Sequence, residues 1–457
     1  MKVVFGQVKD PREPQRFAPL WAAYLKAYAS QYVNAEWHIC YSPEEAARLS
    51  PDVLALSVNS QDWDEVPNWI TAGGDVVIGG HHVTGVGRAQ VQEQYPEAEV
   101  IVGPGEAAFT NYLLARSGSH IRCDPPENLD DIPIPDHTFG VGDMQPHLIT
   151  SRGCPYVCSF CSPKNMWRRI KFHSAERVVE EIKIIRNHYP DVGTGLTGGR
   201  RVLMIWDDLF AANLKRVQEI SDALRRDGIN IKFWCGMRPE LVTADRCAVY
   251  KEMGLTRIYI GAESGVDSLL KKLKSDSASV AKNQQALDAM AAHGIEASAN
   301  ILLGHWDETE RDVIDSYEWL LKNYREGKLQ DHELAILTPF PATPLWDQAD
   351  GRGLLGRDLS WRQLRYYCMK ANPYRSRREW MIARRRNGSI YLNEHNVPQE
   401  SLYRIIDYYE GRIAMSRPDV MFRTAKRWVA RHFPGAVPVL QRVARPVREA
   451  VRHVRSG

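Results

Sequence analysis

The stretch TSRGCPYVCSFCSPKNMW, residues 150–167, places three cysteines, Cys154, Cys158 and Cys161, within eight residues. Thiolates gathered in this way bind zinc or an iron–sulfur cluster. A structural zinc site uses four ligands, as two separated pairs or with histidines at a set spacing, and the sequence holds no such second group. Three cysteines on a four-iron cluster leave one iron without a protein ligand, and an open metal position is typical of a catalytic centre. The spacing therefore predicts a catalytic [4Fe–4S] cluster.

The cysteine stretch begins in the first of six apolar segments that alternate with helix-like segments. The six are HLITSRG, RVLMIWDD, IKFWCGM, RIYIGAES, ASANILLG and HELAILTPF. Helical patterns such as SAERVVEEIKIIRNHY and ETERDVIDSYEWLLKNY lie between them. Six β/α units over residues 147–350 predict a full or partial TIM-type (β/α)6 barrel. Its active site is expected at the carboxyl ends of the strands, where the cysteines follow the first strand.

The remainder of the chain divides into parts of different character. Residues 1–122 carry the short β-branched runs MKVVFG, DVLALSV, DVVIGG and AEVIVG, which predict a parallel, doubly wound Rossmann-like domain. Residues 123–146 are rich in Pro and Asp and are expected to form a linker. Residues 351–457 are helical in pattern, aromatic and rich in Arg, which predicts a basic helical C-terminal domain. The expected fold class is therefore α/β, with two β/α domains and a helical C-terminal region.

Composition excludes several classes of protein. Apolar residues make up 44% of the chain and charged residues 25%, as in ordinary globular proteins. No stretch approaches the roughly 20 consecutive apolar residues needed to span a bilayer, and the charged start MKVVFGQVKDPREPQ does not resemble a secretion signal. We therefore expect a cytoplasmic protein without a membrane partner. The other five cysteines occur singly and are expected to be buried or inert thiols: Cys40, Cys123, Cys235, Cys247 and Cys368.

The net charge of +3 conceals an uneven distribution. Residues 351–457 hold 23 Lys and Arg against 8 Asp and Glu, and the preceding 350 residues hold 36 against 48. An acidic body favours a cationic or neutral small-molecule substrate. The basic tail could contact RNA or a membrane, but we prefer to interpret it as a solvated helical surface.

Together with Phe160, the three cysteines match the pattern C-x3-C-x-aromatic-C, and here the sequence resembles the radical S-adenosylmethionine (SAM) superfamily. The resemblance implies that Cys154, Cys158 and Cys161 hold a [4Fe–4S] cluster whose open iron binds SAM. It also implies reductive cleavage of SAM to a 5′-deoxyadenosyl radical, which abstracts a hydrogen atom from the substrate. An electron donor of the flavodoxin or ferredoxin type is a further implied partner.

Three later segments resemble the strands that bind SAM in this family. Asp207, in VLMIWDDLF, matches the polar position that receives the amino group of SAM, with helix capping as the alternative. Arg238, in FWCGMRPELV, could meet the SAM carboxylate, with a structural ion pair as the alternative. Glu263 and Ser264, in IYIGAESGVDSLL, close a strand where ribose hydroxyls would find partners.

The segment NILLGHWDETERDV resembles the adenine-binding strand, with Leu302 and Gly304 as cofactor-binding residues. His305, Trp306 and Asp307 replace part of the usual G-x-P-G-E-T pattern, which indicates a diverged pocket. The following TPFPATPLWD matches an element of the cobalamin-associated branch of the superfamily.

The end of the first domain resembles the B12-binding domain of that branch. The residues that match its pattern are Gly79, Gly80, Thr84, Gly103, Gly105 and Glu106. The Asp-x-His-x-x-Gly loop that would ligate cobalt is missing, and FGQVKDPREPQ lacks the small residues expected against a corrin. Cobalamin binding and a scaffold role both stay open, with scaffold preferred. For His81 and His82, in GGHHVTG, an exposed or capping role is preferred over a pocket role.

The favoured function is radical dehydration of an aminoglycoside-like amino sugar in the biosynthesis of a natural product such as an antibiotic, because the chain is similar to radical diol dehydratases. Asp208, His305 and Asp307 are the candidates for moving protons at the barrel mouth. The alternative is a cobalamin-dependent C-methyltransferase. A further alternative is a tRNA-modifying enzyme, but residues 1–146 lack the cysteines for a second cluster, and we expect no nucleic-acid partner. A non-catalytic iron–sulfur scaffold is disfavoured because the SAM-binding segments are recognisable.

Overall fold

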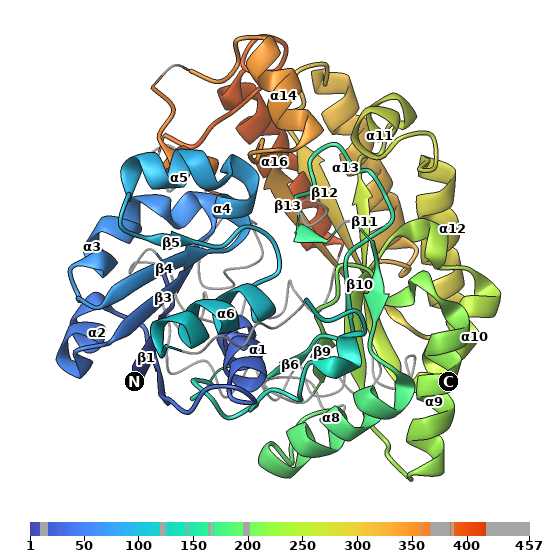
Figure 1. Ribbon diagram of the computed structural model, residues 1–457. Helices are drawn as coiled ribbons and strands as arrows, with labels where there is room; N and C mark the ends of the chain where they lie inside the picture. The colour runs from blue at the N-terminus through green and yellow to red at the C-terminus, as the bar shows by residue number, and fades with distance from the viewer. Residues whose placement is uncertain are drawn as a thin grey trace, which may run out of the picture.

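The computed structural model contains two parallel β-sheets that face one another across the molecule (Figure 1). The first belongs to the N-terminal part of the chain, in blue, and the second to the green and yellow part. The structure describes residues 1–9, 17–118, 125–142, 144, 146–162, 166–167, 169–194, 202–356, 358–365, 384 and 388–416. No helix in this described part is long and apolar enough to cross a bilayer.

The first sheet has five parallel strands in the order β2-β1-β3-β4-β5. Their bounds are β1 Lys2–Gly6, β2 Glu36–Cys40, β3 Val53–Ser57, β4 Asp75–Gly79 and β5 Glu99–Val100. The predicted strands are present, and β2 is an additional edge strand that the sequence reading missed. Its sequence, EWHIC, is only partly buried and carries no β-branched alternation.

Helices cover both faces of this sheet because its side chains alternate between two cores. Val3 and Phe5 pack with α1 and α6, whereas Val4 packs on the opposite face with α2, α3 and α5. The doubly wound arrangement predicted from the sequence is therefore confirmed. The helices are α1 Leu20–Ala29, α2 Pro43–Leu49, η1 Ser60–Glu65, α3 Val66–Ile70, α4 His81–Val86, α5 Arg88–Gln94 and α6 Glu106–Arg116.

The second sheet has six parallel strands in the order β13-β12-β11-β10-β9-β6. Their bounds are β6 His147–Leu148, β9 Leu203–Ile205, β10 Phe233–Met237, β11 Leu255–Glu263, β12 Glu296–Leu303 and β13 Asp331–Ile336. Each of the six predicted segments supplies one strand. Within the described residues the edge strands β6 and β13 do not pair with each other, so the barrel is partial rather than closed.

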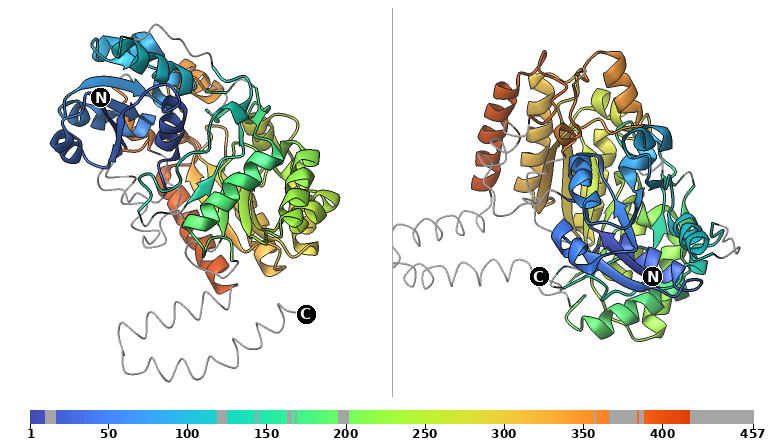
Figure 2. Two further views of the ribbon diagram at one scale, coloured as in Figure 1. Left: turned by 60° about the horizontal axis from the view of Figure 1, so that its bottom comes forward. Right: turned by 60° about the vertical axis from the view of Figure 1, so that its left-hand side comes forward.

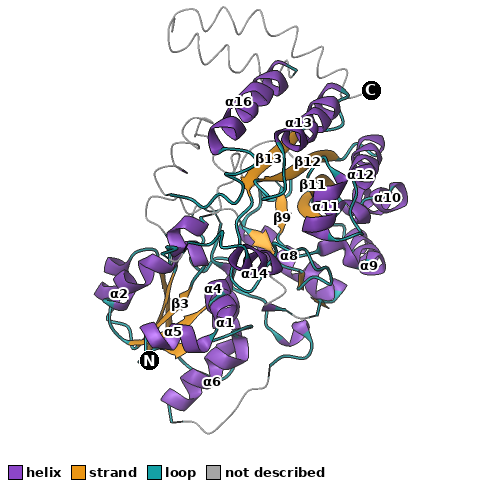
Figure 3. Cartoon of the chain, turned by 90° about the horizontal axis from the view of Figure 1, so that it is seen from above, coloured by secondary structure: helices purple, strands orange, loops and turns teal. Residues whose placement is uncertain are grey.

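Helices line the outer side of this second sheet (Figure 3). They are α8 Ala175–His188, η3 Phe210–Ala212, α9 Leu214–Arg226, η4 Pro239–Leu241, α10 Ala244–Met253, α12 Val280–Ala292 and α13 Glu310–Arg325. Phe233 and Cys235 belong to the core shared with these helices. Since side chains alternate along a strand, Trp234 and Gly236 face the inside of the partial barrel. Helix α11 Asp267–Lys274 lies instead at the carboxyl end of the strands, above β11 in Figure 1.

The segment between the sheets is anchored to the barrel by a buried charged group. It contains the short helix η2, Leu129–Asp131. His137 Nε2 lies 2.8 Å from Glu181 Oε1 on α8, and Arg177 donates to the other oxygen of Glu181 at 2.9 Å. Arg177 also donates to the carbonyl of Ile132 at 3.1 Å. Burial alone would raise the pKa of Glu181, but its hydrogen bond to His137 and the positive charges of His137 and Arg177 hold it below the ordinary value.

The described C-terminal elements attach to both halves of the molecule. They are α14 Pro344–Gly351, η5 Trp361–Leu364 and α16 Gln399–Met415. Helix α16, red in Figure 2, lies along α13, where Tyr409 donates to Glu318 at 2.7 Å. In η5, the Trp361 ring lies 4.6 Å from that of His82 in the first domain. The predicted domain boundary at residue 351 remains a prediction, and most of the basic tail lies outside the described residues.

The buried charged group at Glu181 gives a test of the fold. Replacing Glu181 by Ala should lower the free energy of unfolding by about 3–5 kcal/mol, because it leaves buried Arg177 without its partner. Urea unfolding followed by circular dichroism measures the change. The matched control is Glu180→Ala on the exposed face of the same helix, and equal losses in the two variants would contradict the role assigned to Glu181.

Candidate active site between the two sheets

The cysteine loop connects two short antiparallel strands, β7 Ser151–Arg152 and β8 Lys171–Phe172. Gly153, between β7 and Cys154, has a φ of +88°, and a Cβ at this position would lie 2.8 Å from the carbonyl oxygen of Arg169. Glycine is therefore required to bring the two sides of the loop together. Further along, the Ser159 amide donates to the carbonyl of Leu273 at 2.8 Å, which fixes the loop over the end of α11.

Two adjacent carboxylates at the end of β9 hold the start of this loop. Asp207 accepts hydrogen bonds from the Thr150 amide and hydroxyl, both at 2.5 Å, and from the Ser151 hydroxyl at 2.7 Å. Asp208 accepts from the Gly153 amide at 2.7 Å. Burial raises the pKa of Asp207, and the hydrogen bonds from Thr150 and Ser151 oppose the rise. All three hydrogen bonds of Asp207 therefore go to the loop, whereas the side chain of Asp208 is exposed.

Arg238, at the end of β10, contacts a predicted cluster ligand. Its guanidinium donates to Cys158 Sγ at 2.9 Å and to Glu240 at 3.1 Å, and lies 3.9 Å from the centre of the Tyr156 ring. Burial raises the pKa of Cys158, and the nearby positive charges of Arg238 and Lys274 oppose the rise. The predicted cation is thus at the cysteine loop, and its ion pair with Glu240 shows that the alternative structural role applies as well.

Lys274, which the sequence reading missed, is a second cation at this place. It is the last residue of α11 and is buried, with Nζ 3.7 Å from Glu263 Oε1 and a hydrogen bond to the carbonyl of Gly261. Glu263 adopts a φ of +61°, which turns the end of β11 towards this cation. Burial raises the pKa of Glu263, while the charges of Lys274 and Arg238 oppose the rise.

These groups fit a cluster with SAM better than a single metal ion. In the described part of the chain, no three His, Cys, Asp or Glu side chains are close enough together to hold one ion. A four-iron cluster instead takes each thiolate on a different iron, which suits three cysteines spread along a loop. The buried Asn300 Oδ1, on the inner face of β12, has no hydrogen-bond partner among the described residues. An unpaired buried acceptor fits a ligand hydroxyl or amine, as SAM carries.

A cavity of about 320 Å³ lies between the first sheet and the cysteine loop. One wall is the carboxyl edge of the first sheet, with Ser57, Gly79, Gly80, Gly103 and Gly105. The opposite wall is formed by residues around the cysteine loop and β9, namely Ser151, Arg152, Met166, Trp167, Trp206 and Asp208. Since carboxyl ends of parallel strands are where ligands bind in α/β folds, each sheet presents its ligand-binding edge to the same space.

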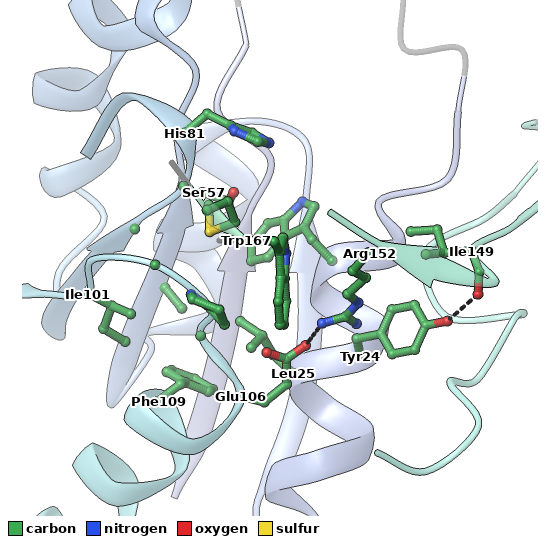
Figure 4. Close-up of a pocket in the computed structure, with 18 of the residues that line it drawn as sticks. Tyr24, Leu25, Ser57, His81, Ile101, Glu106, Phe109, Ile149, Arg152 and Trp167 are labelled. Atoms are coloured by element: carbon green, nitrogen blue, oxygen red, sulfur yellow. Dashed lines mark hydrogen bonds and ion pairs between the residues drawn. The ribbon is translucent and has the colours of Figure 1, made fainter. Parts of the chain in front are cut away.

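Arg152 crosses this cavity between the two halves of the molecule (Figure 4). Its guanidinium pairs with buried Glu106 at the start of α6, and lies 4.7 Å from the ring centre of Tyr24 and 5.2 Å from that of Trp167. Burial opposes the charged form, but Glu106 and Tyr24 outweigh it and raise the pKa of Arg152. His81, the first residue of α4, is exposed as expected and also lines the cavity.

The other residues expected to resemble a B12-binding edge also lie here. The Gly103 amide donates to the Thr84 hydroxyl at 3.0 Å, and that hydroxyl donates to the Gly80 carbonyl at 2.9 Å. Thr84 thus joins the ends of β4 and β5. His82 instead packs away from the cavity between Trp63 and Trp361, at ring distances of 4.3 and 4.6 Å.

Comparison with known proteins agrees with this geometry. Residues 148–320 match the Radical SAM superfamily. Residues 148–320 are therefore a radical SAM domain. Such a domain implies a [4Fe–4S] cluster and SAM as cofactors.

Relatives of known sequence include several methyl-transferring proteins. An uncharacterised methyltransferase of Pyrococcus horikoshii is 28% identical over 355 residues, covering 69% of this chain and 72% of that protein. The hopanoid C-3 methylase of Methylococcus capsulatus is 24% identical, and the anaerobic magnesium-protoporphyrin IX monomethyl ester cyclase of Cereibacter sphaeroides is 23% identical. These two matches cover 70% and 72% of this chain but only 62% and 60% of the relatives.

Solved structures share the two-sheet architecture. One is TsrM, a radical SAM methyltransferase from Kitasatospora setae with cobalamin and a [4Fe–4S] cluster bound, at a TM-score of 0.61 and 15% identity over 78% of this chain and 79% of that one. Another is OxsB, a cobalamin-dependent radical SAM enzyme, at a TM-score of 0.59 and 17% identity over 79% of this chain and 54% of that one. The fold is therefore that of a radical SAM barrel preceded by a B12-binding-type domain.

The remaining residues that were predicted to bind SAM have varied surroundings. Phe160 and Leu302 pack together in a small apolar cluster on the inner side of the barrel. Ser264 is turned away from it, since its hydroxyl accepts from the Val266 amide at 3.1 Å and lies 3.4 Å from that of Ser316. A structural role in the turn after β11 therefore accounts for Ser264.

The segment after β12 forms a buried turn. The Gly304 amide donates to Glu308 at 2.6 Å, and burial raises the pKa of Glu308 to about 8. His305 is buried against Trp306, at a ring distance of 4.3 Å, and burial lowers its pKa to about 4. His305 therefore stays neutral near pH 7.

Of the three predicted proton-moving residues, His305 and Asp307 contact each other in the turn after β12, and only Asp208 is among the residues that line the cavity. Asp208 lines the cavity, whereas the half-exposed carboxylate of Asp307 pairs with Lys272 at 2.6 Å. His305 Nδ1 accepts from the Asp307 amide at 3.1 Å. Of the three, Asp208 is the residue in position to act in the cavity.

The two carboxylates of β9 give a test of how the loop is held. Asp207→Asn should lower the iron content after anaerobic reconstitution and lower the free energy of unfolding by about 1–3 kcal/mol, because an amide cannot accept from all three donors. Asp208→Asn keeps an oxygen for the Gly153 amide and should assemble the cluster normally. Iron analysis and thermal unfolding measure both variants. Equal cluster content in both would contradict the assignment.

Proposed function

We propose that this protein is a cobalamin-dependent radical SAM enzyme that methylates a carbon atom of a small-molecule substrate. The observation that carries the proposal is the shared cavity, whose walls come from the glycine-rich edge of the first sheet and from the cysteine loop. A scaffold domain would have no need of an open ligand-binding edge directed at the catalytic loop. The cofactor of one domain would thus lie next to the reactive centre of the other.

The glycines at the first-sheet edge fit a large, flat ligand. Gly103 has a φ of +82°, and a Cβ on it would meet no atom within 4 Å, so the backbone there borders open space. Gly80 has a φ of +105°, and a Cβ would lie 2.6 Å from the Val58 amide nitrogen. Glycine is required at Gly80 for the backbone, and at Gly103 it leaves the backbone accessible to a ligand. Small side chains such as Ala55 and Ser57 continue this surface.

When bound, the cluster and SAM supply a 5′-deoxyadenosyl radical and a corrinoid supplies the methyl group. The chain's own residues supply binding and orientation. Arg238 and Lys274 offer two buried cations near Cys158 for the carboxylate of SAM. Asn300 offers an unpaired acceptor on the inner face of the barrel. Arg152, held by Glu106, joins the two walls and keeps the cavity at a fixed width.

Methyl transfer is preferred here over the dehydration that the sequence favoured. Two of the relatives and one of the similar solved structures are methyltransferases or methylases by name, and two of the similar solved structures contain cobalamin. Dehydration of an amino sugar requires proton-moving groups near the leaving hydroxyl, and His305 and Asp307 are engaged elsewhere. An amino-sugar substrate and an electron donor of the flavodoxin or ferredoxin type rest only on the resemblance of the sequence to known families.

Cobalamin retention tests the proposal. After anaerobic cluster reconstitution, wild-type protein should retain about one hydroxocobalamin through desalting, as read from the absorption spectrum. The variant Gly79→Leu fills the cavity edge without a backbone clash, since a Cβ there lies 3.4 Å from its nearest neighbour, and should retain at least tenfold less corrinoid. The control Gly411→Leu, in α16, also meets no atom within 4 Å and should retain corrinoid as the wild type does.

The products of SAM distinguish the two functions. With cobalamin and reductant, a methyltransferase forms S-adenosylhomocysteine as well as 5′-deoxyadenosine. A protein that retains no corrinoid, forms 5′-deoxyadenosine alone and deoxygenates an amino sugar would contradict the proposal.

A further inference from the structure

Trp206 is an aromatic residue of the cavity wall that takes no part in holding the cysteine loop. It follows β9 directly and is 50% exposed, although Met204 and Ile205 before it are buried. It is one of the residues that line the cavity. A large aromatic side chain that stays open inside an enzyme cavity offers a flat surface to a ligand.

The indole of Trp206 is held in place from behind. The ring of Phe17 lies 4.6 Å from it at an interplanar angle of 59°, and the ring of His147 lies 5.9 Å away. Phe17 and His147 also contact each other, at 6.1 Å. These neighbours fix the orientation of the indole, so the exposed half of its surface is a preformed platform.

Gly236 leaves a gap beside this platform. Strands β9 and β10 run parallel, with Met204 opposite Trp234 and Ile205 opposite Cys235, so the next step places Trp206 beside Gly236. Gly236 faces the inside of the barrel and is exposed, and a Cβ on it would meet no atom within 4 Å. Glycine within a strand lowers stability, and it is found where another group must approach closely.

The gap lies directly below the cysteine loop. Two residues further along the same strands are Asp208, which accepts from the Gly153 amide, and Arg238, which donates to Cys158. A group resting on Trp206 would therefore lie one step deeper in the barrel than the predicted cluster ligands. It would also open onto the cavity that both sheets share.

We propose that the substrate carries a planar, conjugated ring, which stacks on Trp206 over Gly236. This inference rests on the proposed function, because it names the class of substrate that the same site would methylate. A flat π-surface gains from the face of an indole, whereas a puckered, saturated sugar lacks such a surface. The substrate class is thus a fused aromatic or conjugated ring system rather than an amino sugar.

The test uses protein with its cluster reconstituted and SAM present, without reductant so that no turnover occurs. Binding of quinoline, as a planar probe, is compared at pH 7 with that of decahydro-2-naphthol, a saturated and puckered bicyclic compound that is also uncharged, by ligand-observed NMR. Wild type should prefer quinoline at least tenfold. Trp206→Ala should reduce the preference to less than threefold, Trp206→Phe should retain most of it, and Trp346→Ala, outside the cavity, should leave it unchanged.

Gly236 is tested by filling the gap. The series Gly236→Ala, Gly236→Val and Gly236→Leu should weaken quinoline binding progressively, because each side chain occupies more of the space over the strand. Equal affinity of wild type for the two probes, or an unchanged preference in Trp206→Ala and Gly236→Leu, would overturn the inference. If wild type retains no corrinoid but the preference depends on Trp206, the proposed methyl transfer fails while the stacking site stands.

Discussion

The hydrogen bonds that Asp207 and Asp208 accept from the start of the cysteine loop constrain the rest of the site. A loop that holds a cluster must keep three thiolates in place while leaving one side open, so its own backbone has few internal bonds. Here the neighbouring strand supplies the hydrogen-bond acceptors. Both carboxylates follow β9 and accept hydrogen bonds from Thr150, Ser151 and Gly153. Arg216 adds a hydrogen bond to the Thr150 carbonyl at 2.7 Å. The start of the loop, residues 150–153, is therefore attached directly to the sheet.

The same loop joins the two halves of the molecule. Arg152 lies two residues before Cys154 and pairs with Glu106, at the start of the last helix of the first domain. A ligand in the cavity would contact the stack that Tyr24, Arg152 and Trp167 form. It would thereby contact Arg152, which is only two residues from Cys154 in the chain. The first domain in this way supplies one wall of the cavity beside the cysteine loop.

Local patterns in the sequence predicted the features that depend on short spacing. The β/α rhythm predicted most strands of both sheets, and the cysteine spacing predicted the radical SAM domain, because each is encoded within a few residues. The edge strand β2 was missed since its sequence lacks alternation. Lys274 resembles any lysine in the last turn of an amphipathic helix, and only its position under the end of β11 shows that it is buried.

Features that depend on distant partners were not predictable in this way. Glu106 lies 46 residues before Arg152, and nothing in either segment indicates the pair. Asp307 was grouped with Asp208 because both follow strands, but Lys272 holds it elsewhere. Trp206 was counted as part of a strand, and its exposure follows from the open space at Gly236 on the neighbouring strand. Side-chain direction and long-range pairing decide these cases.

The central claim is that corrinoid and cluster occupy one shared space. Pulsed electron paramagnetic resonance on protein carrying both cob(II)alamin and the one-electron-reduced [4Fe–4S] cluster tests it most directly, because the two paramagnetic centres report their separation through dipolar coupling. The account predicts a strong dipolar coupling between the two centres when cob(II)alamin and the reduced cluster are both present. Bound cob(II)alamin without measurable coupling to the cluster would contradict it.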